Sequence, residues 1–301
     1  MRFIKNIALM MIVNIGIVIT LSIVLQLLGV GHYMEAQGIN YQALAVFCLV
    51  WGMGGAFISL LLSKVMVKWM MGVKVIEEPQ NSSNPEVRRL YSALSKSAER
   101  AGLEKVPELG IYESSEMNAF ATGPSRNNSL VAVSTGLLNS MNDSELEGVI
   151  GHEVAHIANG DMITMTLLQG VVNALIMFVA RIIAFAVASR AEKDSSRHMI
   201  HFVTVIACEL LLGILGMMVV SWFSRRREFR ADAGSAQFVG REKMISALQA
   251  LQNKSRFIDN AHPQMQAFKI NSGSKSSFLR LFMSHPPLEE RIAALRTPAS
   301  M

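Results

Sequence analysis

Four long apolar stretches constrain the fold of this chain more than any other feature. They cover residues 7–30, 42–62, 163–189 and 199–223, and each is long enough to cross the hydrocarbon core of a bilayer, about 30 Å thick, as a helix. Charged residues make up only 17% of the 301 residues, whereas a soluble domain has about a quarter. The sequence therefore predicts an integral membrane protein with four transmembrane helices in contact with the lipid bilayer.

The distribution of positive charge predicts how these helices are oriented. Lys and Arg precede the first stretch and follow the second and the fourth, whereas the loop at 31–41 has none. Since cytoplasmic loops are enriched in Lys and Arg, we expect both termini and the polar regions outside the two hairpins to face the cytoplasm. Three cations in the loop between the third and fourth stretches weigh against this orientation.

The polar regions predict one cytoplasmic domain that is divided in the sequence. We expect an N-terminal transmembrane hairpin at 1–72, a first part of the domain at 73–162, a second hairpin at 163–223 and a second part of the domain at 224–301. Each polar part is short for an independent domain, so a single shared domain is the simpler arrangement.

Turn and capping residues predict an α+β domain that is mainly helical with a small sheet. Asn84-Pro85 begins a helix that extends to Ala101. A second helix begins at the capping box of Asn142 and Glu145 and ends near Gly160. Between these helices lie three short alternating segments that are expected to be strands, namely Glu108–Tyr112, Asn118–Thr122 and Leu130–Ser134.

The second helix carries the motif His152-Glu153-Val154-Ala155-His156. Two histidines four residues apart lie on one face of a helix and can bind a single zinc ion. Glu153 points to a neighbouring angle, from which it can act as the general base for a zinc-activated water. This spacing is typical of zinc peptidases and predicts a hydrolase with one catalytic zinc ion.

A catalytic zinc ion needs a third protein ligand, and Glu228 is the best candidate. It follows the fourth apolar stretch, so its helix starts at the membrane surface where the motif helix also ends. Asp232 lies one turn further on the same face, where it can accept a hydrogen bond from a zinc-binding histidine. Alternatively, both carboxylates only balance the arginines at 225–227 and 230 on a solvated surface.

These motifs resemble those of membrane-bound gluzincin peptidases, a group that includes the HtpX heat-shock protease family and the CAAX prenyl endopeptidases. The sequence is most similar to the HtpX family. The similarity includes Gly151-His-Glu-Val-Ala-His-Ile-Ala-Asn-Gly-Asp161, Asn118-Ala-Phe-Ala-Thr-Gly123 and Ser284-His-Pro-Pro-Leu-Glu-Glu-Arg-Ile292. The order of apolar stretches, motif and third ligand candidate also fits, so the resemblance spans nearly the whole chain.

The resemblance implies a stress-response endopeptidase of the bacterial inner membrane that degrades damaged or misassembled membrane proteins. It implies that His152, His156 and Glu228 bind zinc and that Glu153 is the catalytic base. It also implies that an edge strand holds the substrate backbone, which agrees with the way peptides add to an exposed sheet edge. That strand comprises Asn118, Ala119, Phe120, Ala121, Thr122 and Gly123. The alternative for this segment is an ordinary core strand.

Peptide hydrolysis also needs a second electrophile for the carbonyl oxygen that becomes negative. His285 is the candidate, with Arg291 positioned to orient it, and Tyr112 is a weaker alternative. His285 precedes two prolines, so the simpler interpretation is a capping role at the start of a helix.

Two charged residues, Arg181 and Glu209, fall inside apolar stretches at similar depth. Charges within a membrane are costly and tend to pair, so we expect a contact between them. A structural pair is the simpler interpretation, and a substrate or proton path is the alternative.

Other functions lack support in the sequence. There is no phosphate-binding Gly-x-x-x-x-Gly-Lys loop, so extraction of substrates from the bilayer would need an ATP-dependent partner, either a protease or an extraction factor. There is no nucleic-acid-binding motif. A non-catalytic membrane scaffold, an ion or solute carrier that uses Arg181 and Glu209, and a peptidase that processes few substrates remain the competing hypotheses.

Overall fold

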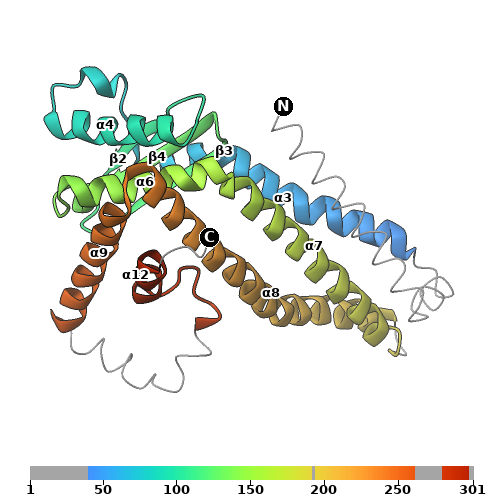
Figure 1. Cartoon of the computed structure of the whole chain (residues 1–301). Coiled ribbons are helices and arrows are strands. Elements are labelled where there is room, and N and C mark those ends of the chain that lie inside the picture. Colours follow the sequence, from blue (N-terminus) through green and yellow to red (C-terminus); the bar gives the residue numbers. More distant parts are fainter. Residues whose placement is uncertain (1–39, 192–193, 262–279, 298–301) are drawn as a thin grey trace. The chain divides into compact units, whose positions relative to one another are not determined.

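The computed structural model describes residues 40–191, 194–261 and 280–297 (Figure 1). The described chain is mostly helical and contains a small four-stranded sheet. Three of its helices are long and apolar enough to cross a membrane, and they contain the second, third and fourth predicted stretches except for the last residue of the third. These are α3 (Tyr41–Met70), α7 (Asp161–Ala188) and α8 (Asp194–Val239). The first predicted stretch, 7–30, lies outside the described residues.

Large apolar side chains are exposed along these three helices. Val50 and Trp51 of α3 are each 63% exposed, and Leu210 and Leu211 of α8 are similarly exposed. A surface of this kind is unfavourable in water but is what a bilayer requires. The exposed apolar surface supports an integral membrane protein.

The described residues form two compact units. The first contains 40–59 and 164–220, apart from the gap at 192–193, and the second contains 60–163 and the described residues from 221 onward. In the first unit a Cβ added to Gly52 would lie 2.6 Å from the backbone nitrogen of Ala174, so α3 and α7 approach closely at a small residue. Arg181 Nη1 donates a hydrogen bond of 3.0 Å to Glu209 Oε1 in the same unit.

The second unit contains the sheet and the remaining helices. The sheet has the order β1-β2-β4-β3, with β2 and β4 parallel and the outer pairings antiparallel. The four strands are β1 (Lys74–Val75), β2 (Glu108–Tyr112), β3 (Ala119–Ser125) and β4 (Asn128–Ser134). The sequence patterns did not predict β1. They ended the strand that corresponds to β3 at Thr122, whereas β3 continues to Ser125 through an irregularity in its pairing with β4. The topology puts β3 at an edge of the sheet.

Several helices and one helical turn complete the second unit. The helix expected from Asn84-Pro85 is α4 (Pro85–Arg100), with Asn84 as its N-cap. The helix with the histidine motif is α6 (Asp143–Asn159), whose capping box and Gly160 C-cap are as expected. The other elements are η1 (Pro79–Asn81), α5 (Thr135–Leu138), α9 (Arg241–Ala261) and α12 (Leu288–Arg296).

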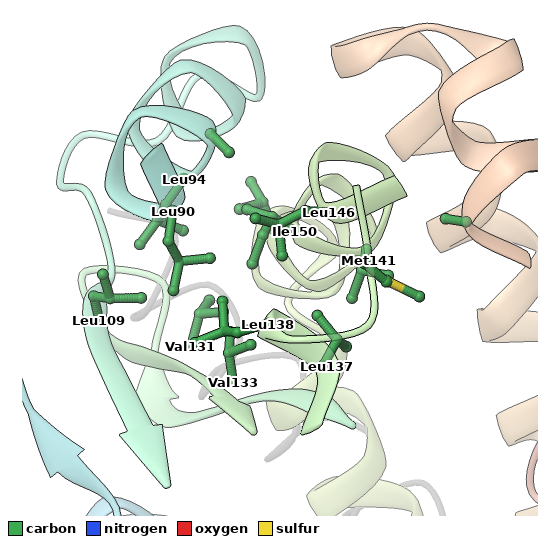
Figure 2. Packing of buried hydrophobic residues seen from close by; sticks show 14 of the residues in the cluster. Leu90, Leu94, Leu109, Val131, Val133, Leu137, Leu138, Met141, Leu146 and Ile150 are labelled. Atoms are coloured by element: carbon green, nitrogen blue, oxygen red, sulfur yellow. The ribbon is translucent and has the colours of Figure 1, made fainter. Parts of the chain in front are cut away.

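The main hydrophobic core lies between one face of the sheet and the helices α4 and α6 (Figure 2). Alternate residues of the strands point into it, as the two-residue period of a strand requires, and they meet leucines and isoleucines spaced three or four apart on the helices. Its fully buried members include Leu90, Leu94, Leu109, Val131, Val133, Leu146 and Ile150. This packing holds α6 along the sheet.

Small residues then bring α6 close to α8 and α9. A Cβ added to Gly148 would lie 2.6 Å from the carbonyl oxygen of Lys243, and one added to Gly234 would lie 2.8 Å from the Cβ of Ala155. Ser235 Oγ also donates a hydrogen bond of 2.8 Å to the carbonyl of Gly148. The residues around the histidine motif therefore lie against the part of α8 that follows its apolar stretch.

We predict that Gly234→Ala destabilises the second unit, because the new methyl group would overlap Ala155 and force α8 away from α6. Overpacking of this kind costs about 1–3 kcal/mol. Gly213→Ala on the same helix is the matched control, because an added Cβ there meets no atom of the described residues within 4 Å. Thermal unfolding of the detergent-purified variants should show a lower midpoint for Gly234→Ala alone. An equal change in both variants would contradict the packing argument.

Candidate metal centre

The local structure around the histidine motif begins with the end of α6. Gly160 adopts the left-handed conformation with φ of 72°, and its N–H binds the carbonyls of His156 and Ile157. A glycine is favoured here because a side chain would strain this conformation. The sharp turn starts α7 at Asp161, whose Oδ2 then lies 2.6 Å from His156 Nδ1.

The helix α8 supplies the opposite side of the site. We expected a new helix to start after the apolar stretch at 199–223, but α8 continues without a break to Val239. Glu228 and Asp232 lie one turn apart on it, and their side chains are fully or almost fully buried. Burial contradicts the alternative in which both carboxylates belong to a solvated charged surface.

Three side chains converge on one point. His152 and His156 of α6 and Glu228 of α8 are all buried, and one ligand atom of each lies within 4.8 Å of the other two. The two Nε2 atoms are 3.1 Å apart. Each Nε2 also lies 3.4 Å from a different oxygen of Glu228. This donor set could hold a metal ion.

The orientation of the imidazoles supports a cation at this point. The Nδ1 atoms lie 2.9 Å from Asp232 Oδ1 and 2.6 Å from Asp161 Oδ2, and ionised carboxylates only accept hydrogen bonds. In neutral imidazoles the hydrogen is therefore on Nδ1, and both Nε2 lone pairs point at the same place. Neither buried oxygen of Glu228 has a well-aligned hydrogen bond from the described residues. A cation would satisfy all of these atoms.

The pKa values show the same preference for added positive charge. Burial acts to lower the pKa of His156, but Asp161 and Glu228 outweigh this effect and raise it to about 9. The pKa of His152 is raised as well, because Asp232 and Glu228 outweigh burial. Burial acts to raise the pKa of Glu228, and the neighbouring imidazoles hold it well below its usual range. A metal ion that binds here must displace any proton on these imidazoles.

Arg291 of α12 lies on the outer side of Asp232. Its Nε and Nη2 donate hydrogen bonds of 2.8 and 2.6 Å to the two carboxylate oxygens, the two-pronged geometry that gives a strong charged pair. Its Nη1 lies 3.5 Å from Glu228 Oε2. We expected Arg291 to orient His285, but its contacts in the described chain are with Asp232, Glu228 and His152.

His285 also reaches the site. Its Nδ1 lies 2.8 Å from Glu228 Oε2, and its side chain is 64% exposed. No side-chain capping bond is found at the start of α12, where Pro287 is the N-cap. Tyr112, the weaker alternative, is buried beside Phe120, with ring centroids 5.7 Å apart. Burial raises the pKa of its hydroxyl.

Glu153 belongs to α6, and the edge strand β3 packs against the core that this helix helps to form. Glu153 is buried, and its charge contributes to the raised pKa values of His156 and Arg291, so it lies near both side chains. Ala119 and Ala121 of β3 pack against the core that includes Val154 of α6. Six residues were expected at this edge, and β3 contains five of them, since Asn118 immediately precedes the strand.

Asp161 is the site residue to which sequence reasoning assigned no role. It belongs to the motif run that ends Asn159-Gly160-Asp161, and the available signal was the glycine. A left-handed residue at the end of a helix reverses the chain, and here the reversal returns the next side chain to the last turn. Arg230 Nη2 lies 3.6 Å from the second oxygen of Asp161.

The fold and the site together define the class of integral membrane metallopeptidases. The chain belongs to peptidase family M48, whose model matches residues 81–299. It is 50% identical over 296 residues to the "Protease HtpX homolog" of Thiobacillus denitrificans, with 97% of this chain and 99% of that protein covered. It is 47% identical over 297 residues to the "Protease HtpX homolog" of Bacillus subtilis, with 97% and 98% covered.

A solved structure shares the fold. The crystal structure of S. mikatae Ste24p matches with a TM-score of 0.60 and 18% sequence identity. The match covers 94% of this chain and 66% of that chain, so this chain spans slightly less than two thirds of it. At this level of identity the likeness concerns the fold alone.

We predict that Asp161→Asn weakens metal binding about 10- to 100-fold, the usual effect of removing a carboxylate that holds a metal-binding histidine. The substitution keeps the size of the side chain but removes the charge that favours Nδ1–H on His156. Asp143→Asn is the matched control, because Asp143 is an exposed carboxylate of α6 that pairs with Arg89. Zinc affinity, measured by competition with a chromophoric chelator, should fall only for Asp161→Asn. Equal affinities in both variants would exclude this role.

Proposed function

We propose that the protein is a zinc-dependent endopeptidase of the bacterial inner membrane that hydrolyses misfolded or damaged membrane proteins on the cytoplasmic side. The observation that carries the proposal is the convergence of His152, His156 and Glu228 on one buried point, with Glu153 beside it. Family membership supports peptide hydrolysis. The proposal combines the geometry of the candidate metal site with the family membership.

The donor set supports zinc as the metal. Two imidazole nitrogens and one carboxylate oxygen form a set that zinc prefers in hydrolases, where three protein ligands leave a position for water or substrate. Asp232 and Asp161 would hold the two imidazoles in the binding orientation, and Arg291 would hold Asp232. When bound, zinc polarises the scissile carbonyl and lowers the pKa of water to about 7.

The chain's own residues would perform the proton transfers. Glu153 would take the proton from the attacking water and pass it to the nitrogen of the leaving amine. His285, whose Nδ1 faces Glu228, would donate an N–H to the carbonyl oxygen, which gains negative charge during attack. Its exposure and its contact with Glu228 support this role.

The edge strand would hold the substrate. A peptide in extended form can add to β3 through backbone hydrogen bonds, so that many sequences are accepted and side chains contribute little. Residues 118–123 would provide this edge, next to the helix that carries Glu153. Binding through the backbone suits an enzyme that removes damaged proteins of unrelated sequence.

The proposed protease domain consists of 73–162 and 224–301, between and after the proposed transmembrane hairpins at 1–72 and 163–223. The basic residues that follow the stretches at 42–62 and 199–223 support a cytoplasmic active site. Polypeptides of the membrane would be the substrates. Since the chain has no nucleotide-binding loop, extraction of a folded substrate from the bilayer would depend on an ATP-dependent partner.

We predict that Glu153→Gln lowers the rate of cleavage of an unfolded membrane protein about 10²- to 10⁴-fold, the usual contribution of a general base, while bound zinc stays stoichiometric. Glu147→Gln is the control, since it makes the same change on the same helix at a residue that pairs with Lys243. The assay uses detergent-purified protein with zinc, and a chelator arm should abolish wild-type cleavage.

Two results would count against the proposed function. Full cleavage by Glu153→Gln would mean that Glu153 is not the base, and a zinc-loaded wild-type protein that cleaves nothing would favour a scaffold. A panel of unrelated unfolded membrane proteins separates the substrate classes. Cleavage of several supports removal of damaged proteins, whereas cleavage of a single one supports a processing peptidase.

We predict that His285→Ala lowers kcat about 10²- to 10³-fold with little change in KM, because the lost donor acts only on the charge that develops during attack. Zinc content and the thermal unfolding midpoint of the variant are measured in parallel. An unchanged kcat with a lower midpoint would instead show that His285 contributes to the stability of the fold.

A further inference from the structure

A short segment far along the chain is fixed to α8 where its apolar stretch ends. Ser221 Oγ donates a hydrogen bond of 3.1 Å to the carbonyl of Phe282. Arg225 Nη1 donates to the carbonyls of Arg280, Leu281 and Met283 at 3.1, 3.3 and 2.7 Å. Three carbonyls around one guanidinium nitrogen hold residues 280–283 in place beside this turn of α8.

The same segment exposes apolar side chains. Leu281 is 37% exposed and Met283 is 44% exposed, and Trp222 on the adjoining turn of α8 is 50% exposed. Exposed apolar groups are unfavourable in water, whereas tryptophan in particular is enriched where a membrane meets water. The apolar stretch of α8 ends at Phe223, so Trp222 is at the level of that boundary.

The charge beside these side chains is positive. The Arg226 guanidinium lies over the Trp222 ring, 4.3 Å from its centroid, and no ion pair of Arg226 is found in the described part of the chain. Arg225 is already bound to the segment, and the Arg280 side chain lies 3.4 Å from Glu290. Among the described residues of this surface, Arg226 is therefore the cation available to an anionic group.

We propose that Trp222, Arg226, Leu281 and Met283 form an interfacial patch that docks residues 280–283 on a bilayer surface with anionic phospholipid headgroups. Leu281, Met283 and the Trp222 ring would lie at the level of the acyl chains and glycerol groups, and Arg226 would bind headgroup phosphates. Three observations indicate a bilayer with anionic headgroups as the partner: the continuity with a candidate membrane span, the aromatic side chain at its end and the positive charge of Arg226, which has no ion pair within the described residues.

The patch connects the bilayer to the candidate metal centre. His285 follows Met283 by two residues and contacts Glu228, and Arg291 on the next helix contacts Asp232. Lipid contact would therefore fix the segment that carries both groups. This consequence for catalysis rests on the proposed function, whereas the lipid contact itself does not.

The test uses the full-length protein in nanodiscs of phosphatidylcholine mixed with phosphatidylglycerol. A photoreactive benzoylphenylalanine replaces Leu281, Met283 or, as a control, Val106, which is 40% exposed in the same unit. After irradiation, mass spectrometry identifies the adducts. We expect phospholipid adducts at positions 281 and 283 and none at 106. A lack of lipid adducts at 281 and 283, or equal yields at all three positions, would overturn the proposal.

Arg226→Gln tests the headgroup preference. With the photoreactive residue at 283, we expect the enrichment of phosphatidylglycerol over phosphatidylcholine in the adducts to fall by up to about fivefold, the contribution of one cation near an anionic surface. Arg241→Gln, an exposed arginine at the start of α9, should leave it unchanged. An enrichment that persists in Arg226→Gln would exclude Arg226 as the headgroup-binding residue.

Cleavage of a short soluble peptide by protein in nanodiscs and in detergent distinguishes the lipid-contact proposal from the proposed peptidase function. Leu281→Ser with Met283→Ser should lower cleavage severalfold in nanodiscs, and much less in detergent, where no bilayer orders the segment. Equal losses in both media would show that the apolar groups act on the fold rather than through lipid. If lipid adducts form but zinc-loaded wild-type protein cleaves nothing, the patch stands and the proposed function fails.

Discussion

The candidate site depends on the interactions that stabilise the buried carboxylate of Glu228. An ionised carboxylate without compensation costs several kcal/mol in a protein interior, and Glu228 has no exposure to solvent. Its compensation comes from three places in the sequence: the two imidazoles of α6, the imidazole of His285 and the guanidinium of Arg291. A charge on α8 that requires partners from α6, from His285 and from α12 ties these parts of the chain together. The buried negative charge of Glu228 needs positive charge nearby, and the same need makes this residue able to bind a cation.

Around this carboxylate, charge alternates outward in layers. The imidazoles that face Glu228 are backed by Asp232 and Asp161, and these are backed by Arg291 and Arg230. Each layer fixes the protonation and orientation of the one inside it, which is how ligands are held ready for a metal ion. These residues lie close together because Gly148 and Gly234 let α6 pack tightly against α9 and α8. Packing and electrostatics therefore act on the same few turns.

Local signals in the sequence account for most of α6 and for the choice of Glu228. The capping box at Asn142, the glycine at 160 and the spacing of the two histidines depend only on neighbours along the chain, and so does the one-turn interval from Glu228 to Asp232. Three features could not be found this way. The two-residue strand β1 exists only through its pairing with β2. Arg291 meets Asp232 across 59 residues. The run Arg225–Arg227 looked like a boundary, but arginine is a good helix former, and α8 continues through it.

The helix α8 runs without a break from its apolar stretch to Glu228 of the candidate metal centre (Figure 1). Glu228 follows the last residue of the apolar stretch, Phe223, by five positions, which is about 7.5 Å along a helix. No flexible joint within α8 can lengthen this interval. For the proposed function, this fixed interval along α8 would favour cleavage of peptide bonds that are held close to the end of the apolar stretch. Under that proposal, a substrate segment that has just left the bilayer would be the preferred target, whereas a distant loop would first have to fold back toward the membrane.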